Sequence, residues 1–133
     1  MDVPNLEKLA KDIVVERLKN TPDAPGDCGL IARQIAAQAF ANSDTQQQPA
    51  QSVRAVCRGL MSGMLLLEKD LPRAAVAILS QMGTVAHETH QDPAEMMTWA
   101  MEGIAPVAKL SGEHARATIQ DAIETAFMGA GDV

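Results

Sequence analysis

Two histidines are the residues whose type and spacing come nearest to a chemical site in this sequence. His87 and His90 lie three positions apart, separated by Glu88 and Thr89. Side chains at that spacing on a helix are neighbours, so both imidazoles could reach one metal ion. Spacing marks no third ligand elsewhere, and protonated histidines near a helix C-terminus also interact favourably with the helix dipole. We therefore keep metal binding by this pair as an alternative to a plain surface position.

The two cysteines are the next candidates, because a thiolate can act as a nucleophile or a metal ligand. Cys28 and Cys57 lie far apart in the chain and neither belongs to a CxxC motif, so the sequence indicates neither a zinc ribbon nor a redox pair. Arg58 could lower the pKa of its neighbour Cys57, but the sequence gives this thiol no base. We expect both thiols to be small apolar side chains, and a disulfide would require an oxidising compartment.

Motifs for other kinds of catalysis are missing from the sequence. It contains no Gly-x-Ser-x-Gly, no glycine-rich phosphate loop ending in Lys-Ser/Thr and no His-Glu-x-x-His, which are the patterns of common hydrolases, nucleotide-binding proteins and zinc proteases. A di-iron carboxylate bundle needs Glu-x-x-His pairs, and the sequence has none. We therefore expect no enzymatic activity, no catalytic residue and no cofactor.

Charge and composition argue against nucleic acid as a partner. The chain has 11 Lys and Arg against 17 Asp and Glu, which gives a net charge of −6 and a pI of about 4.9. A phosphate backbone is held by a basic surface, which this composition does not provide. Trp99, Phe40 and Phe127 are the only aromatic residues, too few for a base-stacking surface.

The sequence also predicts where the chain resides. Its N-terminal residues 1–4 have neither the basic nor the apolar segment of a signal peptide. Its longest uncharged apolar stretch, 59–67, is much shorter than the about 20 residues that cross a bilayer. We expect a soluble, cytoplasmic protein without a membrane-spanning helix.

Helical periodicity and start signals predict the elements that must position these side chains. The run from Asp92 to Glu95 is the clearest start, since it combines a capping Asp, a proline at the first helical position and a Glu three residues after the cap. Asp27 and Asp70 are expected to cap the second and fourth helices. The predicted helices run over about 4–19, 28–41, 49–69, 71–90, 93–110 and 113–128.

The connections between these helices predict the architecture. Pro106 either kinks the fifth helix or ends it early, and Gly129 is expected to close the sixth. No window alternates apolar and polar residues as a strand does. Short connections favour antiparallel neighbours, so we predict an all-α fold: a compact bundle of about six helices that forms a single domain over residues 1–133.

Small residues on the third predicted helix indicate a close helix contact. Ala55, Gly59 and Gly63 recur four residues apart, so they share one flank of the helix, and another backbone can approach them closely. Glycine costs about 1 kcal/mol relative to alanine inside a helix, and tight packing would compensate for that cost. The sequence leaves open whether the approaching backbone belongs to the same chain or to another subunit.

The fifth predicted helix is apolar around most of its circumference. Its polar residues form a narrow stripe at Glu95, Thr98, Glu102 and Lys109. Three explanations remain open: the helix is central in the bundle, its second face meets another subunit, or that face binds a ligand. The apolar residues are Met96, Met97, Trp99, Met101, Ile104, Val107 and Leu110.

Two functional hypotheses follow from these features. The first is an interaction or scaffolding module that acts as a homo-oligomer, with a dimer as the first expectation and a protein partner as its target. Its contact face would include Met96, Trp99 and Met101. The alternative is a carrier or sensor of a small apolar ligand, bound by these same three side chains, or of a metal ion, bound by His87 and His90.

Overall fold

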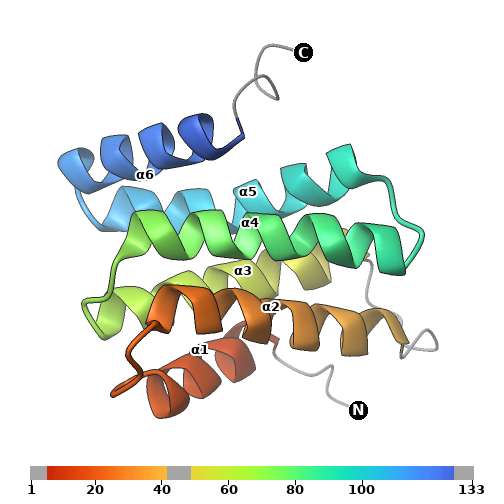
Figure 1. Ribbon diagram of the computed structural model, residues 1–133, viewed down its shortest axis with the longest axis horizontal. Coiled ribbons are helices and arrows are strands. Elements are labelled where there is room, and N and C mark those ends of the chain that lie inside the picture. The colour runs from red at the N-terminus through yellow and green to blue at the C-terminus, as the bar shows by residue number, and fades with distance from the viewer. Residues whose placement is uncertain (1–5, 42–48, 128–133) are drawn as a thin grey trace.

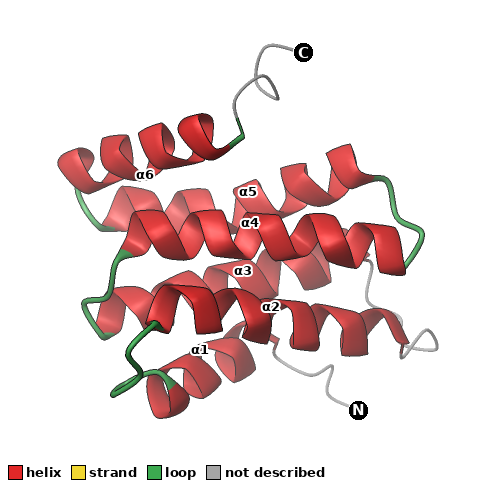
Figure 2. Cartoon of the chain, in the orientation of Figure 1, coloured by secondary structure: helices red, strands yellow, loops and turns green. Residues whose placement is uncertain are grey.

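The structure of this chain, a computed structural model, describes residues 6–41 and 49–127. These residues form helices joined by short loops and contain no strand, so the prediction of an all-α fold is confirmed (Figure 2). The helices are α1 (Leu6–Arg17), α2 (Ala24–Ala41), α3 (Pro49–Leu66), α4 (Leu71–Glu88), α5 (Pro93–Leu110) and α6 (Glu113–Ala126).

The helices pack as two layers of three (Figure 1). The layer nearer the viewer contains α2, α4 and α6, and the layer behind it contains α1, α3 and α5. The most extensive contacts join α1 to α3, α2 to α4 and α3 to α5, whereas α5 and α6 touch at few positions. Consecutive helices therefore lie in different layers. Each helix packs mainly on a helix two places away in chain order.

The core lies between these layers and consists of aliphatic and methionine side chains. On α4 one apolar stripe is buried along the whole helix and consists of Leu71, Ala75, Ile78, Met82 and Val85. Removing such apolar surface from water contributes about 25 cal/mol per Å². The largest fully buried side chains are Leu60, Met61, Met64, Ile78, Leu79, Met82, Met96, Ile104, Ile119, Val14, Val53 and Val56.

The small residues of α3 lie against α1. A Cβ atom at Gly59 would overlap the carbonyl oxygen of Glu7, and one at Gly63 would lie only 2.8 Å from Cγ1 of Val14. Ala55, one turn before Gly59, is half-buried. The close approach that the sequence indicates at the two glycines is therefore made within the chain.

Two other glycines make the same kind of contact in the other large helix pairs. A Cβ atom at Gly29 of α2 would lie 2.8 Å from the carbonyl oxygen of Ala77 on α4. A Cβ atom at Gly103 of α5 would lie 2.5 Å from the carbonyl oxygen of Arg54 on α3. Real Cβ atoms do not approach other atoms so closely, so these positions must remain glycine for the helices to keep their spacing.

The predicted starts of α4 and α5 are confirmed by their caps. Oδ1 of Asp70 accepts a hydrogen bond from the backbone N–H of Arg73 at 3.2 Å. Oδ1 of Asp92 accepts one from the backbone N–H of Ala94 at 3.0 Å. Each carboxylate thus satisfies a helix N–H group that has no partner within the helix.

The start of α2 differs from the prediction, and the prediction that Asp27 caps this helix is wrong. The helix begins a turn earlier, at Ala24. The backbone N–H of Gly26 donates to Oδ1 of Asp23 at 3.2 Å, so Asp23 is the capping residue. Pro25 fits in the first turn, where its missing N–H costs no hydrogen bond. Asp27 lies in that turn too, where a carboxylate is favoured by the helix dipole.

The ends of α3 and α4 precede their predicted boundaries. The helices end at Leu66 and Glu88, because Glu68 and His90 adopt positive φ angles of 57° and 59°. In both helices the N–H group after this residue donates to a carbonyl five residues back, at 3.0 and 2.9 Å. This is the hydrogen bond of a Schellman motif, which usually has glycine at the positive φ position.

Two predictions concerned the course of the last two helices: the effect of Pro106 on α5 and the end of α6 at Gly129. α5 continues through Pro106 to Leu110, so the proline does not end it early. α6 runs from Glu113 to Ala126. Gly129, the residue expected to close this helix, lies outside the described residues.

We predict opposite effects on stability for two glycine-to-alanine substitutions. Gly59→Ala should lower the free energy of unfolding by about 1–3 kcal/mol, because the added methyl group overpacks the contact with α1. Gly83→Ala is the matched control in α4: a Cβ there meets nothing within 4 Å, so the higher helix propensity of alanine should raise stability by about 1 kcal/mol. Urea unfolding measures both, and a Gly59→Ala variant as stable as Gly83→Ala would contradict the packing argument.

Candidate functional site

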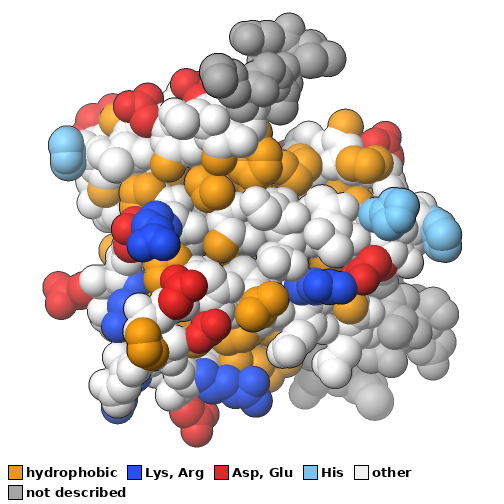
Figure 3. Space-filling model, in the orientation of Figure 1, with side chains coloured by type: hydrophobic (Ala, Val, Ile, Leu, Met, Phe, Trp, Pro, Cys, Tyr) orange, Lys and Arg blue, Asp and Glu red, His pale blue; other side chains and the backbone are white. Residues whose placement is uncertain are grey.

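The histidine pair lies at the surface, at one end of α4. His87 is in the last turn of the helix and His90 lies beyond it, and both are exposed. The positive φ of His90 turns the chain away from the helix axis, so the common helical face that the spacing predicts does not extend to this residue. Histidine side chains are pale blue on the surface in Figure 3. Among the described residues, no group of three or more His, Cys, Asp or Glu is placed to hold a metal ion.

The two cysteines are buried in the core as free thiols. Cys28 lies on α2 and Cys57 on α3. Burial raises the pKa of Cys28 from its ordinary value of 9.0 to about 12. Burial raises the pKa of Cys57 as well, and the nearby Cys28 raises it further. Both thiols are therefore protonated at neutral pH and act as small apolar side chains, not as nucleophiles.

The apolar residues of α5 divide between the core and the surface. Met96 is completely buried, and Trp99 is half-buried against the core. Met101 points outward, with 40% of its surface exposed. Ile104 and Val107 are buried. One face of α5 thus fills the core, whereas Met101 in the middle of the helix and Leu110 at its end remain exposed.

An apolar groove runs between α5 and α6, and we call it the α5–α6 groove. It consists of two adjacent hollows of about 590 and 270 Å³, which share Met101, Ala105, Ile123 and Glu124. Figure 3 shows hydrophobic side chains gathered beneath α6. The larger hollow is also lined by Leu79, Met97, Thr98, Glu102 and Phe127, and the smaller one by Ile104, Ala108, Lys109, Arg116 and Gln120.

The groove exists because α6 packs mainly on α4 and only lightly on α5. Ile119 is the one fully buried residue among those of α6. Ile123 and Phe127, each four residues further along, are half-buried and form a wall of the groove. The helical spacing of these three residues marks this face of α6, but sequence reasoning did not assign it to a site.

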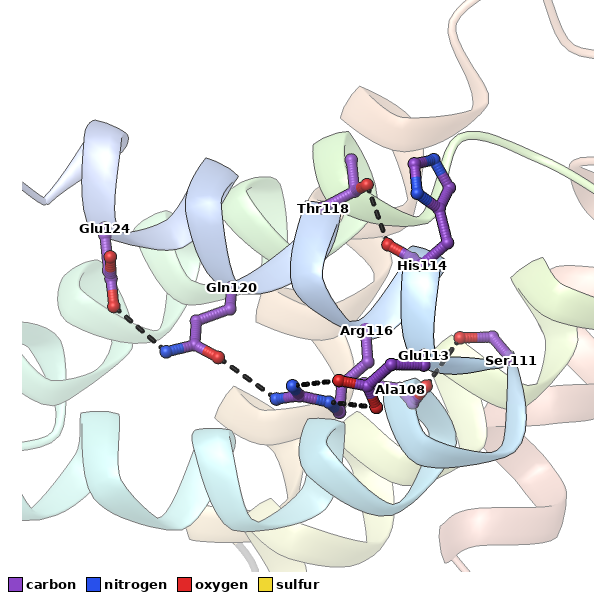
Figure 4. A network of polar contacts seen from close by, with 8 residues as sticks. All are labelled: Ala108, Ser111, Glu113, His114, Arg116, Thr118, Gln120 and Glu124. Carbon is purple, nitrogen blue, oxygen red and sulfur yellow. Dashed lines mark hydrogen bonds and ion pairs between the residues drawn. The ribbon is translucent and has the colours of Figure 1, made fainter.

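A chain of polar contacts along α6 forms one rim of the groove (Figure 4). Glu113 accepts two hydrogen bonds from Arg116, at 2.6 and 3.0 Å, and Arg116 also donates to Gln120 at 3.1 Å. Gln120 in turn donates to Glu124 at 3.1 Å. Arg116 lowers the pKa of Glu113 by hydrogen bonding and charge. These contacts align the polar side chains along α6 beside the apolar floor.

The opposite rim is the outward face of α5. Glu102 lies there and forms an ion pair with Arg54 of α3, with 2.8 Å between Oε1 and Nε. Lys109 lies two turns further along the same helix and is exposed. The groove therefore has an apolar floor between two charged rims, a composition suited to an amphipathic partner.

Comparisons with known proteins assign this chain to no family. No protein-family model, curated protein or solved structure matches it. In the ranges 6–41 and 49–127, no helix combines the length and hydropathy that crossing a membrane requires. The α5–α6 groove is therefore the feature from which we infer a function.

We predict that both native thiols are unreactive and that they make stability depend on alkaline pH. Neither Cys28 nor Cys57 should react with an aromatic disulfide reagent in the folded protein, whereas both should react in urea. The thiols keep their protons to higher pH in the folded state than in the unfolded state. Their contribution to the free energy of unfolding is therefore fully present below about pH 9 and decreases above it. The decline is at most about 1.4 kcal/mol per pH unit for each thiol.

Urea unfolding at several pH values between 8 and about 11 measures this decline. The control is the double variant Cys28→Ala, Cys57→Ala, which should lose the part of the pH dependence that the thiols cause. A rapid reaction of either thiol in the native protein would contradict their burial.

Proposed function

We propose that this protein is a non-catalytic interaction module that acts as a homodimer through the α5–α6 groove and the outward face of α5. The observation that carries the proposal is the exposure of Met101 at the centre of an apolar groove. When a partner covers exposed apolar surface, the free energy of the system falls. Methionine adapts its unbranched side chain to irregular surfaces, which suits it to such a contact.

The other faces that the sequence indicated offer less to a partner. Gly59 and Gly63 already pack against α1, and Met96 is part of the core. Within residues 6–41 and 49–127, the groove remains as an exposed apolar surface with charged rims. A helix laid into an apolar groove is a recurring mode of protein recognition, in which apolar anchors provide affinity.

A reducing compartment fits the two thiols. Cys28 and Cys57 are free and buried, and free thiols persist in the cytoplasm. We therefore propose the cytoplasm as the place where the module acts.

A carrier of a small apolar ligand is the second candidate. The larger hollow, about 590 Å³, falls within the range of about 300–1,000 Å³ that is common for small-molecule sites. Lys109 and Arg116 line the smaller hollow and would suit an anionic head group. The same experiment separates the two candidates, because a carrier can be a monomer with an adduct.

We predict that the wild-type protein has at least twice the monomer mass of 14.1 kDa in solution, and that Met101→Glu shifts it to the monomer. The new carboxylate would have to lose its hydration in the contact, which is strongly unfavourable. Light scattering on a sizing column measures the mass, and circular dichroism checks that the helices are retained.

The matched control is Leu30→Glu, because Leu30 of α2 is 48% exposed and lies outside the groove; this variant should remain a dimer. Native mass spectrometry of the same samples detects adducts. A wild-type monomer without an adduct over the micromolar range would overturn both candidates, and a monomer with a stoichiometric adduct would favour the carrier.

A further inference from the structure

We infer that the second copy of this chain lies antiparallel across α5, with Glu102 of each copy facing Lys109 of the other. This inference rests on the proposed homodimer and specifies its orientation and register. The observation behind it is the order of exposed side chains along the outward face of α5.

Five exposed residues form one stripe on α5. Thr98, Met101, Glu102, Ala105 and Lys109 are all exposed and recur three or four positions apart, within an arc of about 100° on the helix. The stripe lies between the Arg54–Glu102 ion pair on the α3 side and the α5–α6 groove on the other side. A partner that covers the stripe therefore also covers the mouth of the groove.

The charges of the stripe select the orientation. Glu102 and Lys109 have opposite signs and lie two helical turns apart, a separation of about 10 Å along the axis. In a parallel pair of α5 helices in register, Glu102 would face its own counterpart and Lys109 would do the same, so like charges would meet. In an antiparallel pair with its two-fold axis midway between these residues, each Glu102 faces a Lys109. An isologous contact of this kind occurs in most soluble homodimers.

The apolar residues of the stripe fit the same register. Ala105 lies beside the proposed two-fold axis, and its small side chain allows the helices to approach to the usual interaxial distance of about 8–10 Å. Met101 of one copy then lies opposite the smaller hollow of the other, where Ala108 forms part of the lining. In each copy, the adaptable side chain of Met101 thus lies over an apolar surface of the other copy.

The partners of the two charged residues within the chain support these roles. Glu102 is already held at the edge of the stripe by Arg54, so its carboxylate is positioned before the second copy arrives. Lys109 makes no ion pair with the residues that the structure describes. Dimerisation would join Arg54, Glu102 and the second copy's Lys109 into one network of alternating charge.

Charge reversal tests the register directly. Glu102→Lys and Lys109→Glu should each raise the dissociation constant of the homodimer by about tenfold or more, since each variant places like charges together twice. An equimolar mixture of the two variants should form a heterodimer, because both opposite-charge contacts return in it. Native mass spectrometry distinguishes the heterodimer if one variant is isotopically labelled.

Matched controls change the same charges away from α5. Glu16→Lys and Lys19→Glu alter exposed residues near the end of α1 and should leave the dissociation constant unchanged, alone and in the mixture. Circular dichroism of every variant verifies that it is folded.

A disulfide test does not depend on the charge variants. Ala105→Cys should form a disulfide-linked dimer under mild oxidation, because the two introduced thiols lie next to the two-fold axis and a disulfide needs Cβ atoms about 4 Å apart. Glu16→Cys is the control and should not form this dimer efficiently. The native cysteines are buried and do not compete.

The outcomes separate the inference from the proposed function. A wild-type dimer that is unaffected by either charge reversal, or in which Ala105→Cys does not cross-link, would overturn the register and leave the homodimer intact. A wild-type monomer would overturn the homodimer itself. Loss of the homodimer in each single variant, with recovery in the mixture, would support the antiparallel contact.

Discussion

Direct contact between helix backbones at glycine is the constraint on which the layered arrangement depends. Each of the three most extensive helix pairs contains one: Gly59 between α3 and α1, Gly29 between α2 and α4, and Gly103 between α5 and α3. A side chain at any of these positions would push two helices apart. Each glycine costs about 1 kcal/mol in helix propensity, and close packing over the length of both helices offsets that cost. Because these contacts join alternate helices, they sort the chain into two layers.

The same constraint explains where the groove lies. Gly103 fixes α5 against α3, so the position of α5 is set by one layer. α6 belongs to the other layer and packs mainly on α4. No glycine brings α6 onto α5 within the described residues, and the side chains between them, such as Arg116 and Gln120, are long and polar. The space that stays between two independently anchored helices is the α5–α6 groove.

The sequence predicts the local features of this fold well, but it does not predict which helices pack on one another. The caps at Asp70 and Asp92 were predictable because a cap involves only neighbouring residues. The ends of α3 and α4 were not, because Glu68 and His90 adopt a positive φ that glycine would have signalled. Gly59 marks a close approach in the sequence, but periodicity defines a helix face without saying which helix covers it. For the same reason the sequence grouped Met96 with Met101, which lie on different faces of α5.

Affinity and orientation have separate physical sources in the proposed contact. Met101 and the groove supply apolar surface, whose burial is favourable in any orientation. The exposed pair of Glu102 and Lys109 adds little affinity, since ion pairs at a surface contribute about 0–1 kcal/mol. Its contribution is to disfavour the wrong arrangement, because like charges that lose solvent together are repelled. An apolar contact without these charges would allow parallel and antiparallel pairs alike, so the polar stripe that the sequence places on α5 limits the contact to one register.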